Sequence, residues 1–192
     1  MINDSIRVKK VISTIPLREI VTYLDSPKHV LRAAKELDYN SVMIVGIALN
    51  REAPNQHWVY VPEKSIVFHR YAWISNYSPS NAPTGKSALI AEITIPPSQK
   101  VSEDYIIHKT IEGLKALDVI SEGEREIILV KVWKNTFGYP IYTKGHNEAR
   151  KEIVNFLENR GIISVGRWGS WHYWNMDKVY NAAKKVAYDV FL

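Results

Sequence analysis

The sequence contains no cysteine, which excludes disulfide bonds, thiolate metal sites and cysteine nucleophiles. No apolar run approaches the roughly 20 residues that a membrane-spanning helix needs, and the opening residues, MINDSIRVKK, lack the apolar core of a signal peptide. The nine glycines include no pair in G-x-G spacing, so the chain lacks the phosphate-binding fingerprint of a dinucleotide-binding βαβ unit. We therefore expect a cytoplasmic location and a fold stabilised by packing alone.

The composition is that of an ordinary globular protein, with 46% hydrophobic and 23% charged residues in 192. A net charge of +5 permits an anionic partner. The basic residues are scattered, however, which favours a solvated surface over a nucleic-acid interface. The six histidines show neither H-x-x-x-H nor H-E-x-x-H spacing, so we expect no metal site.

Apolar periodicity and turn residues predict an α+β fold, an antiparallel β-sheet with helices packed on it. With no repeat or linker in view, residues 1–192 are expected to form a single α+β unit. Thr14, Ser26 and Ser102 are expected to begin helices. The predicted strands cover 10–15, 41–49, a hairpin at 56–71, 87–95, 126–134 and 161–165, and the predicted helices cover 14–24, 26–40, a segment from 102, a segment from 147, and 176–191.

The segment from Gly166 to Asp177, GRWGSWHYWNMD, carries the strongest chemical signal. It lies between a buried strand and a periodic helix. Glycines let a ligand approach the backbone, Arg167 presents a cationic fork, and free N–H groups at a helix start favour negative charge. The pattern indicates an anion site, although Asn175 and Asp177 are equally typical of a helix that needs no ligand.

This segment resembles the C-terminal FAD-contacting signature of the flavoprotein superfamily that contains protoporphyrinogen oxidase, amine oxidases and UDP-galactopyranose mutase. Other segments resemble that superfamily in the same order, and together they span nearly the whole chain: VISTIP at 11–16, the substrate-domain strands around 60–70 and 88–92, and the YP element at Tyr139-Pro140. The resemblance implies the C-terminal portion of a flavoprotein whose N-terminal dinucleotide-binding βαβ domain is absent from this chain.

The resemblance also implies roles for particular residues, and it leaves the catalytic residues unassigned. A plain aromatic core remains an alternative for the tryptophans, and packing or a solvated surface remains one for the tyrosines and Arg70. The implied contacts with FAD are Gly166, Arg167, Trp168, Asn175, Met176 and Asp177, and those with substrate are Arg70, Tyr139, Tyr142 and Tyr173.

We therefore expect the substrate-domain portion of a FAD-dependent oxidoreductase, holding only part of the FAD site. Activity is expected to require a separate chain that carries G-x-G-x-x-G, together with a small-molecule substrate; a homo-oligomer is possible. The alternative is a non-catalytic binding module that uses its aromatic-rich surface for a sugar, a nucleotide or another protein. Exposed tryptophans that respond to a polysaccharide or single-stranded nucleic acid but not to flavin would favour the second function.

Overall fold

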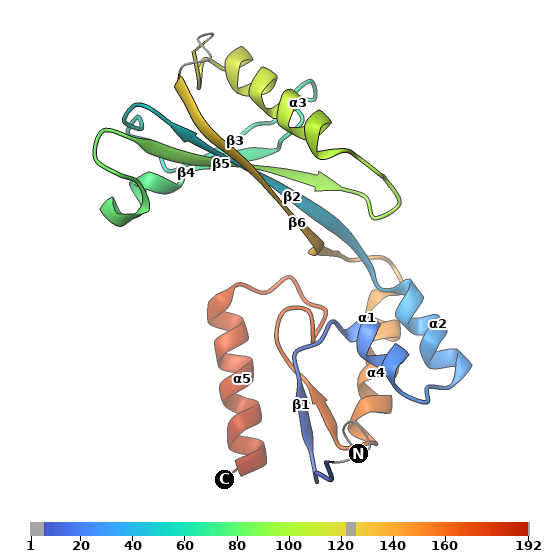
Figure 1. Cartoon of the computed structure of the whole chain (residues 1–192). Coiled ribbons are helices and arrows are strands. Elements are labelled where there is room, and N and C mark those ends of the chain that lie inside the picture. Colours follow the sequence, from blue (N-terminus) through green and yellow to red (C-terminus); the bar gives the residue numbers. More distant parts are fainter. Residues whose placement is uncertain (1–5, 122–125, 192) are drawn as a thin grey trace. The chain divides into compact units, whose positions relative to one another are not determined.

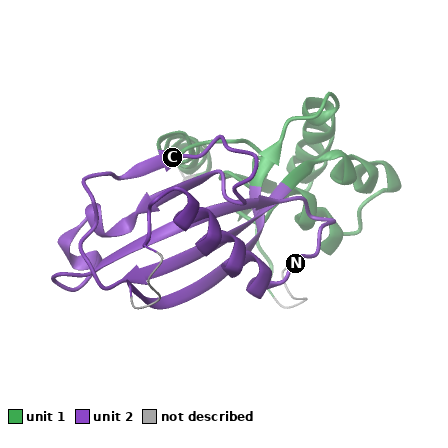
Figure 2. Cartoon of the chain, turned by 90° about the horizontal axis from the view of Figure 1, so that it is seen from above, with its two compact units in different colours: residues 1–39, 139–192 green, residues 40–138 purple. Residues whose placement is uncertain are grey.

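A computed structural model describes residues 6–121 and 126–191 (Figure 1). The chain divides into two compact units, unit 1 with residues 1–39 and 139–192 and unit 2 with residues 40–138 (Figure 2). The sequence predicts one unit because no linker is visible in it. No linker is visible because the two segments that connect the units are themselves strands. β2 (Asp38–Leu49) and β6 (Ile127–Ile141) each continue through the boundary between the units.

Unit 2 is built on a five-strand antiparallel sheet with the order β3-β4-β5-β2-β6. Alternate residues of its strands form the core; Val45 pairs with Ala91, and both are fully buried. The mixed α+β fold that the sequence predicts is confirmed. The remaining strands are β3 (Trp58–Tyr60), β4 (Arg70–Trp73) and β5 (Ser87–Ile95), and two short 3-10 helices, η2 (Ile74–Asn76) and η3 (Pro79–Asn81), lie between β4 and β5.

Helix α3 (Glu103–Ala116) covers one face of this sheet (Figure 1). Ser102 caps it as predicted, because its Oγ accepts a hydrogen bond of 3.2 Å from the N–H of Tyr105. The most buried line of the helix is Ile106, Thr110, Gly113 and Leu114. Leu114 is fully buried, and the partly buried Ile107, Ile111 and Leu117 pack against the same core. Gly113 belongs to this line because its missing side chain leaves room for Ile66 and Phe68.

Unit 1 contains a two-strand parallel sheet, with helix α4 packed against β7 and α2 packed against α4. Two predicted helix starts were wrong by one or two residues. Pro16 and Pro27 occupy the N-cap positions expected for Thr14 and Ser26, and the Ser26 hydroxyl instead donates to the Val21 carbonyl at 2.7 Å. The elements are β1 (Val11–Ser13), α1 (Leu17–Ile20), η1 (Val21–Tyr23), α2 (Lys28–Glu36), α4 (His146–Glu158) and β7 (Ile162–Ser164).

The C-terminal helix α5 (Met176–Phe191) forms where the periodic pattern predicts it. Its apolar residues are not buried as that pattern suggests. Met176 and Tyr180 keep 89% and 67% of their surface exposed, and no described side chain of the helix is fully buried. The side chain of Phe191, the last residue of this helix, lies outside the described ones.

Candidate functional site

A tight turn joins β7 to the segment that precedes α5. Gly166 has φ +98°, a conformation that favours glycine, and a Cβ added to it would meet no atom within 4 Å. The turn closes through hydrogen bonds from the N–H of Ser170 to the Gly166 carbonyl and from the N–H of His172 to the Arg167 carbonyl, at 2.8 and 2.9 Å. Gly169 has a different role from the ligand approach that the sequence suggests, because its Cα lies against the backbone of Val165.

The turn holds Arg167 at the centre of an aromatic stack. Its Nη1 donates to the Trp174 carbonyl at 3.2 Å, and its guanidinium carbon lies 4.3 Å from the ring centre of Tyr173. Tyr173 in turn stacks on Tyr139, with ring centres 5.5 Å apart and planes inclined by 25°. The backbone N–H of Tyr173 donates to the hydroxyl of Tyr142 at 2.8 Å. The three tyrosines that the sequence assigns to substrate therefore gather beside Arg167.

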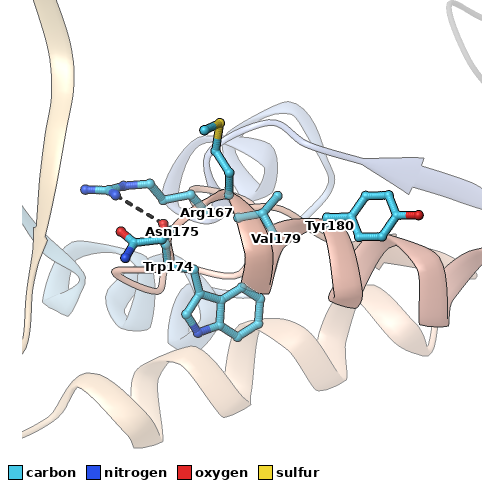
Figure 3. A pocket seen from close by; sticks show the side chains of 6 residues that line it. Arg167, Trp174, Asn175, Val179 and Tyr180 are labelled. Atoms are coloured by element: carbon cyan, nitrogen blue, oxygen red, sulfur yellow. Dashed lines mark hydrogen bonds between the residues drawn. The ribbon is translucent and has the colours of Figure 1, made fainter. Parts of the chain in front are cut away.

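A hollow of about 580 Å³ opens beside this stack at the start of α5 (Figure 3). Arg167 and the flat indole of Trp174 lie at one end, and the first turns of α5 form the other. The Asn175 carbonyl accepts the N–H of Val179 at 3.1 Å, which begins the helix, so the amides of Met176 and Asp177 lie in the first turn, where no intrahelical acceptor exists. The lining residues are Arg167, Trp174, Asn175, Met176, Val179 and Tyr180.

Trp168 and Trp171 do not line the hollow. Trp171 is fully buried, and its Nε1 donates to the Asp38 carbonyl at 3.3 Å. Its ring meets those of Trp168 and Tyr39 edge to face, with centres 5.0 and 6.0 Å apart. Trp171 thus belongs to the aromatic core that the sequence leaves open as an alternative, with the half-buried Trp168 packed against it, whereas Trp174 lines the hollow.

Arg70 belongs to unit 2, on β4. Its Nε and Nη2 both donate to Glu92 Oε2, at 2.9 and 2.5 Å, and its guanidinium carbon lies 4.4 Å from the ring centre of Trp58. Because Glu92 is buried, this pair balances the charge of Arg70 locally. Arg70 is thus held by its own unit, and an anionic substrate group would share it with a carboxylate.

His172 is a site residue that the sequence analysis missed, because it tested the histidines only for metal spacing. The ring of His172 stacks on Trp174 with centres 4.7 Å apart and planes inclined by 21°. Burial, together with the smaller effects of the charges of Arg150 and His146, lowers the pKa of His172 to about 4. The imidazole is therefore neutral at pH 7 and packs as a flat ring behind the wall of the hollow. Its position inside the signature, between Trp171 and Tyr173, is the signal that could have identified it.

Two further features bear on the chemistry of the chain. Within residues 6–121 and 126–191, no three His, Asp or Glu side chains are grouped closely enough to hold a metal ion. Among the same residues, no helix is both long and apolar enough to span a membrane. The positive charge at the hollow comes instead from Arg167 and from the start of α5.

Comparison with known proteins matches residues 3–191 to the model of the family described as flavin containing amine oxidoreductase. Reduced UDP-galactopyranose mutase is similar in structure, with a TM-score of 0.79 and 25% identity over 88% of this chain and 37% of that one. A putative protoporphyrinogen oxidase from Exiguobacterium sp. 255-15 gives a TM-score of 0.71 and 15% identity over 94% of this chain and 40% of that one. A CLA-producing fatty acid isomerase from P. acnes gives a TM-score of 0.65 and 14% identity, over 95% of this chain and 42% of that one. The chain thus spans roughly two fifths of the length of these relatives.

Proposed function

The chain belongs to the flavin containing amine oxidoreductase family, and from that premise we propose that it supplies the substrate-side unit and the C-terminal FAD-contacting segment of a FAD-dependent oxidoreductase. The family is FAD-dependent. The observation that carries the proposal is the hollow at the start of α5, where residues of the FAD-contacting signature converge.

The residues at this hollow fit the edge of a flavin. Among the described residues, Nη1 is the one guanidinium nitrogen of Arg167 with a hydrogen-bond partner, which leaves Nε and Nη2 available to a phosphate or carbonyl oxygen. Trp174 offers a flat apolar face. The amides of Met176 and Asp177 offer donors where negative charge is favoured. These groups support the proposal that unit 1 supplies one wall of a FAD site.

FAD, when bound, supplies the acceptor for two electrons, and the protein's part is positioning and electrostatics. The partial positive charge at the start of α5 would favour negative charge on a bound group there by about 0.3–1 kcal/mol. Asn175 and Gly166 complete the cofactor side. Tyr139, Tyr142 and Tyr173 form the substrate side, because they stand together next to Arg167.

We propose that a separate chain supplies the rest of the FAD site. The sequence contains no G-x-G pair, and the chain covers only 37–42% of three relatives. The partner that we propose is a chain with a G-x-G-x-x-G βαβ unit, whose helix start would bind the pyrophosphate. We propose a small-molecule substrate for the pair and, as expected from the sequence, a cytoplasmic location.

The proposal is tested by titrating FAD into the purified chain alone and mixed with the G-x-G-x-x-G chain of the same organism, with flavin absorbance and fluorescence as readouts. We expect a colourless protein alone and stoichiometric yellow complex in the mixture. Arg167→Gln should weaken FAD binding roughly tenfold or more, because a charge-assisted hydrogen bond contributes about 1.5–3 kcal/mol. Arg160→Gln, a control in the same unit where the arginine packs on Phe156, should not. Tight FAD binding by the isolated chain, or none in any mixture, contradicts the proposal.

A further inference from the structure

We propose that unit 2 binds a small zwitterion, of the class of the free α-amino acids, in a pocket at the C-terminal end of α3. The pocket lies entirely within unit 2, and the inference does not depend on FAD binding in unit 1. Its volume is about 270 Å³, near the lower end of ligand pockets, roughly 300 Å³. A ligand of this pocket is therefore a small molecule. The lining residues that carry the argument are Arg51, Gln56, Tyr71, Trp73 and Asp118.

Two aromatic residues of β4 form the buried part of the pocket. Tyr71 and Trp73 lie two residues apart on the strand and share the face that packs in the core with α3. Only 6% and 1% of their surfaces are exposed. The indole N–H of Trp73 is itself buried, and no side chain or carbonyl of the described residues accepts a hydrogen bond from it. Because a buried donor without an acceptor costs free energy, this N–H favours a ligand that brings an oxygen acceptor.

Arg51 adds further donors beside the indole. Its guanidinium carbon lies 5.3 Å from the ring centre of Trp73. Three of its N–H groups are used within unit 2: Nε donates to Glu126 Oε1, Nη1 to the Glu52 carbonyl at 3.1 Å and Nη2 to the Val119 carbonyl at 2.6 Å. A guanidinium has five N–H groups, so two remain for a further acceptor. A carboxylate matches such donors better than a neutral oxygen does.

Asp118 brings a negative charge to the exposed side of the pocket, directly after α3. Its φ is +53°, at the position after a helix where glycine is usual. The helix ends there because the N–H of Asp118 donates to the Lys115 carbonyl at 3.0 Å and that of Val119 to the Leu114 carbonyl at 2.9 Å. The left-handed conformation disfavours a residue other than glycine, and the negative end of the helix dipole disfavours a carboxylate. Together they favour a cationic group beside Asp118.

Asp118 has no ionic partner of its own in the part of the chain that the structure describes. Arg51, by contrast, pairs with Glu126. The pocket therefore combines unused donors near its buried end with an unbalanced carboxylate near its exposed end. The Tyr71 hydroxyl stays protonated at neutral pH, because burial raises its pKa, and it can donate or accept next to Trp73.

A zwitterion satisfies both ends of the pocket at once. Its carboxylate accepts from the Trp73 indole and from Arg51, and its ammonium group faces Asp118 and the end of α3. A simple anion leaves the charge of Asp118 unbalanced, and a simple cation leaves the indole N–H without an acceptor. A neutral polyol fills the space but gains no charge-assisted hydrogen bond at either end.

NMR titration of the whole chain tests this proposal through the indole N–H of Trp73, whose resonance is assigned by its loss in Trp73→Phe. L-Alanine should shift this resonance and slow its exchange with water at least about tenfold. Propionate and ethylammonium, which each carry one of the two charges, should bind at least about tenfold more weakly, because each loses one charge-assisted hydrogen bond. Equal binding by either, or by glycerol, overturns the proposal. An indole N–H that L-alanine leaves unchanged also overturns it, and indicates that bound water satisfies the group instead.

A matched pair of variants on α3 separates the charge of Asp118 from the general charge of the helix. Asp118→Asn keeps the size of the side chain and a residue that tolerates the left-handed conformation, so the fold should be unaffected. L-Alanine binding, followed at the Val119 amide, should weaken roughly tenfold or more. Asp104→Asn removes the same charge from the exposed first turn of α3 and should leave the affinity unchanged. Equal affinities for the two variants contradict the proposal, whatever the result for FAD.

Discussion

Replacing Gly169 by alanine tests whether the turn before α5 is built on close backbone packing. An added Cβ would stand 2.2 Å from the carbonyl oxygen of Val165 and 2.9 Å from its carbonyl carbon, below the 3.0 Å that real Cβ contacts keep. Both atoms are backbone, so no side-chain rotation relieves the clash. The Gly169 carbonyl also accepts the Ser164 hydroxyl at 2.8 Å. The turn must therefore open, and Arg167 moves with it.

The expected cost is about 3 kcal/mol, the upper end for overpacking in a well-packed interior. Native-state hydrogen exchange of α4 amides reports the stability of unit 1 apart from that of unit 2. Gly145→Ala is the control, because nothing lies within 4 Å of the added Cβ, and it should change stability by less than about 0.5 kcal/mol. Gly166→Ala, which has open space but φ +98°, should cost about 1–2 kcal/mol. If Gly169→Ala is as mild as Gly145→Ala, the account of this turn is wrong.

Three further predictions concern a titrating group, a buried ion pair and a helix cap. The pKa of His172 is lowered to about 4 in the folded state, so the unfolded chain binds more protons between pH 6.5 and 4. Stability should therefore fall as pH drops through that range, by about 1 kcal/mol after allowance for solvent screening, and His172→Gln should remove the effect in urea titrations at several pH values. Glu92→Leu leaves the partly buried Arg70 without its carboxylate and should cost about 3 kcal/mol, measured by urea unfolding of unit 2; a loss below about 1 kcal/mol contradicts the role of the pair. Ser102→Ala removes the acceptor for the Tyr105 amide and should cost about 1 kcal/mol in the same assay, whereas Ser102→Asp should retain most of the stability.

Elements with strong local signals were predicted closely. The strand at 87–95 has the predicted bounds, because a β-rich run is flanked by a loop and by Pro96-Pro97. The cap at Ser102 is also confirmed. Helix starts next to proline were less well predicted, since the sequence favours a Ser or Thr cap while Pro16 and Pro27 adopt the required extended conformation themselves. At both helix starts the sequence allows either the Ser or Thr or the nearby proline to occupy the N-cap, and in the folded chain the proline occupies it.

The candidate site was predicted as a set of residues, and the structure adds their geometry. Arg167, Tyr139, Tyr142 and Tyr173 come from different elements and meet in unit 1. The sequence did not predict that these side chains meet, because the contact depends on how β6 and the turn before α5 fold together. Their roles toward FAD and substrate remain predictions.

The sequence alone determined the α+β class, most of the elements and the family, because periodicity, turn residues and a signature motif are local properties. Only the tertiary structure decided which of several similar residues are available to a ligand. Trp171 and Trp174 lie three residues apart and have the same chemistry, yet the positive φ of +50° at Trp171 turns its ring into the core while Trp174 faces the hollow. Helix α5 is a second example. The apolar periodicity of the sequence predicted the helix, but it did not predict whether the apolar side chains of the helix are buried.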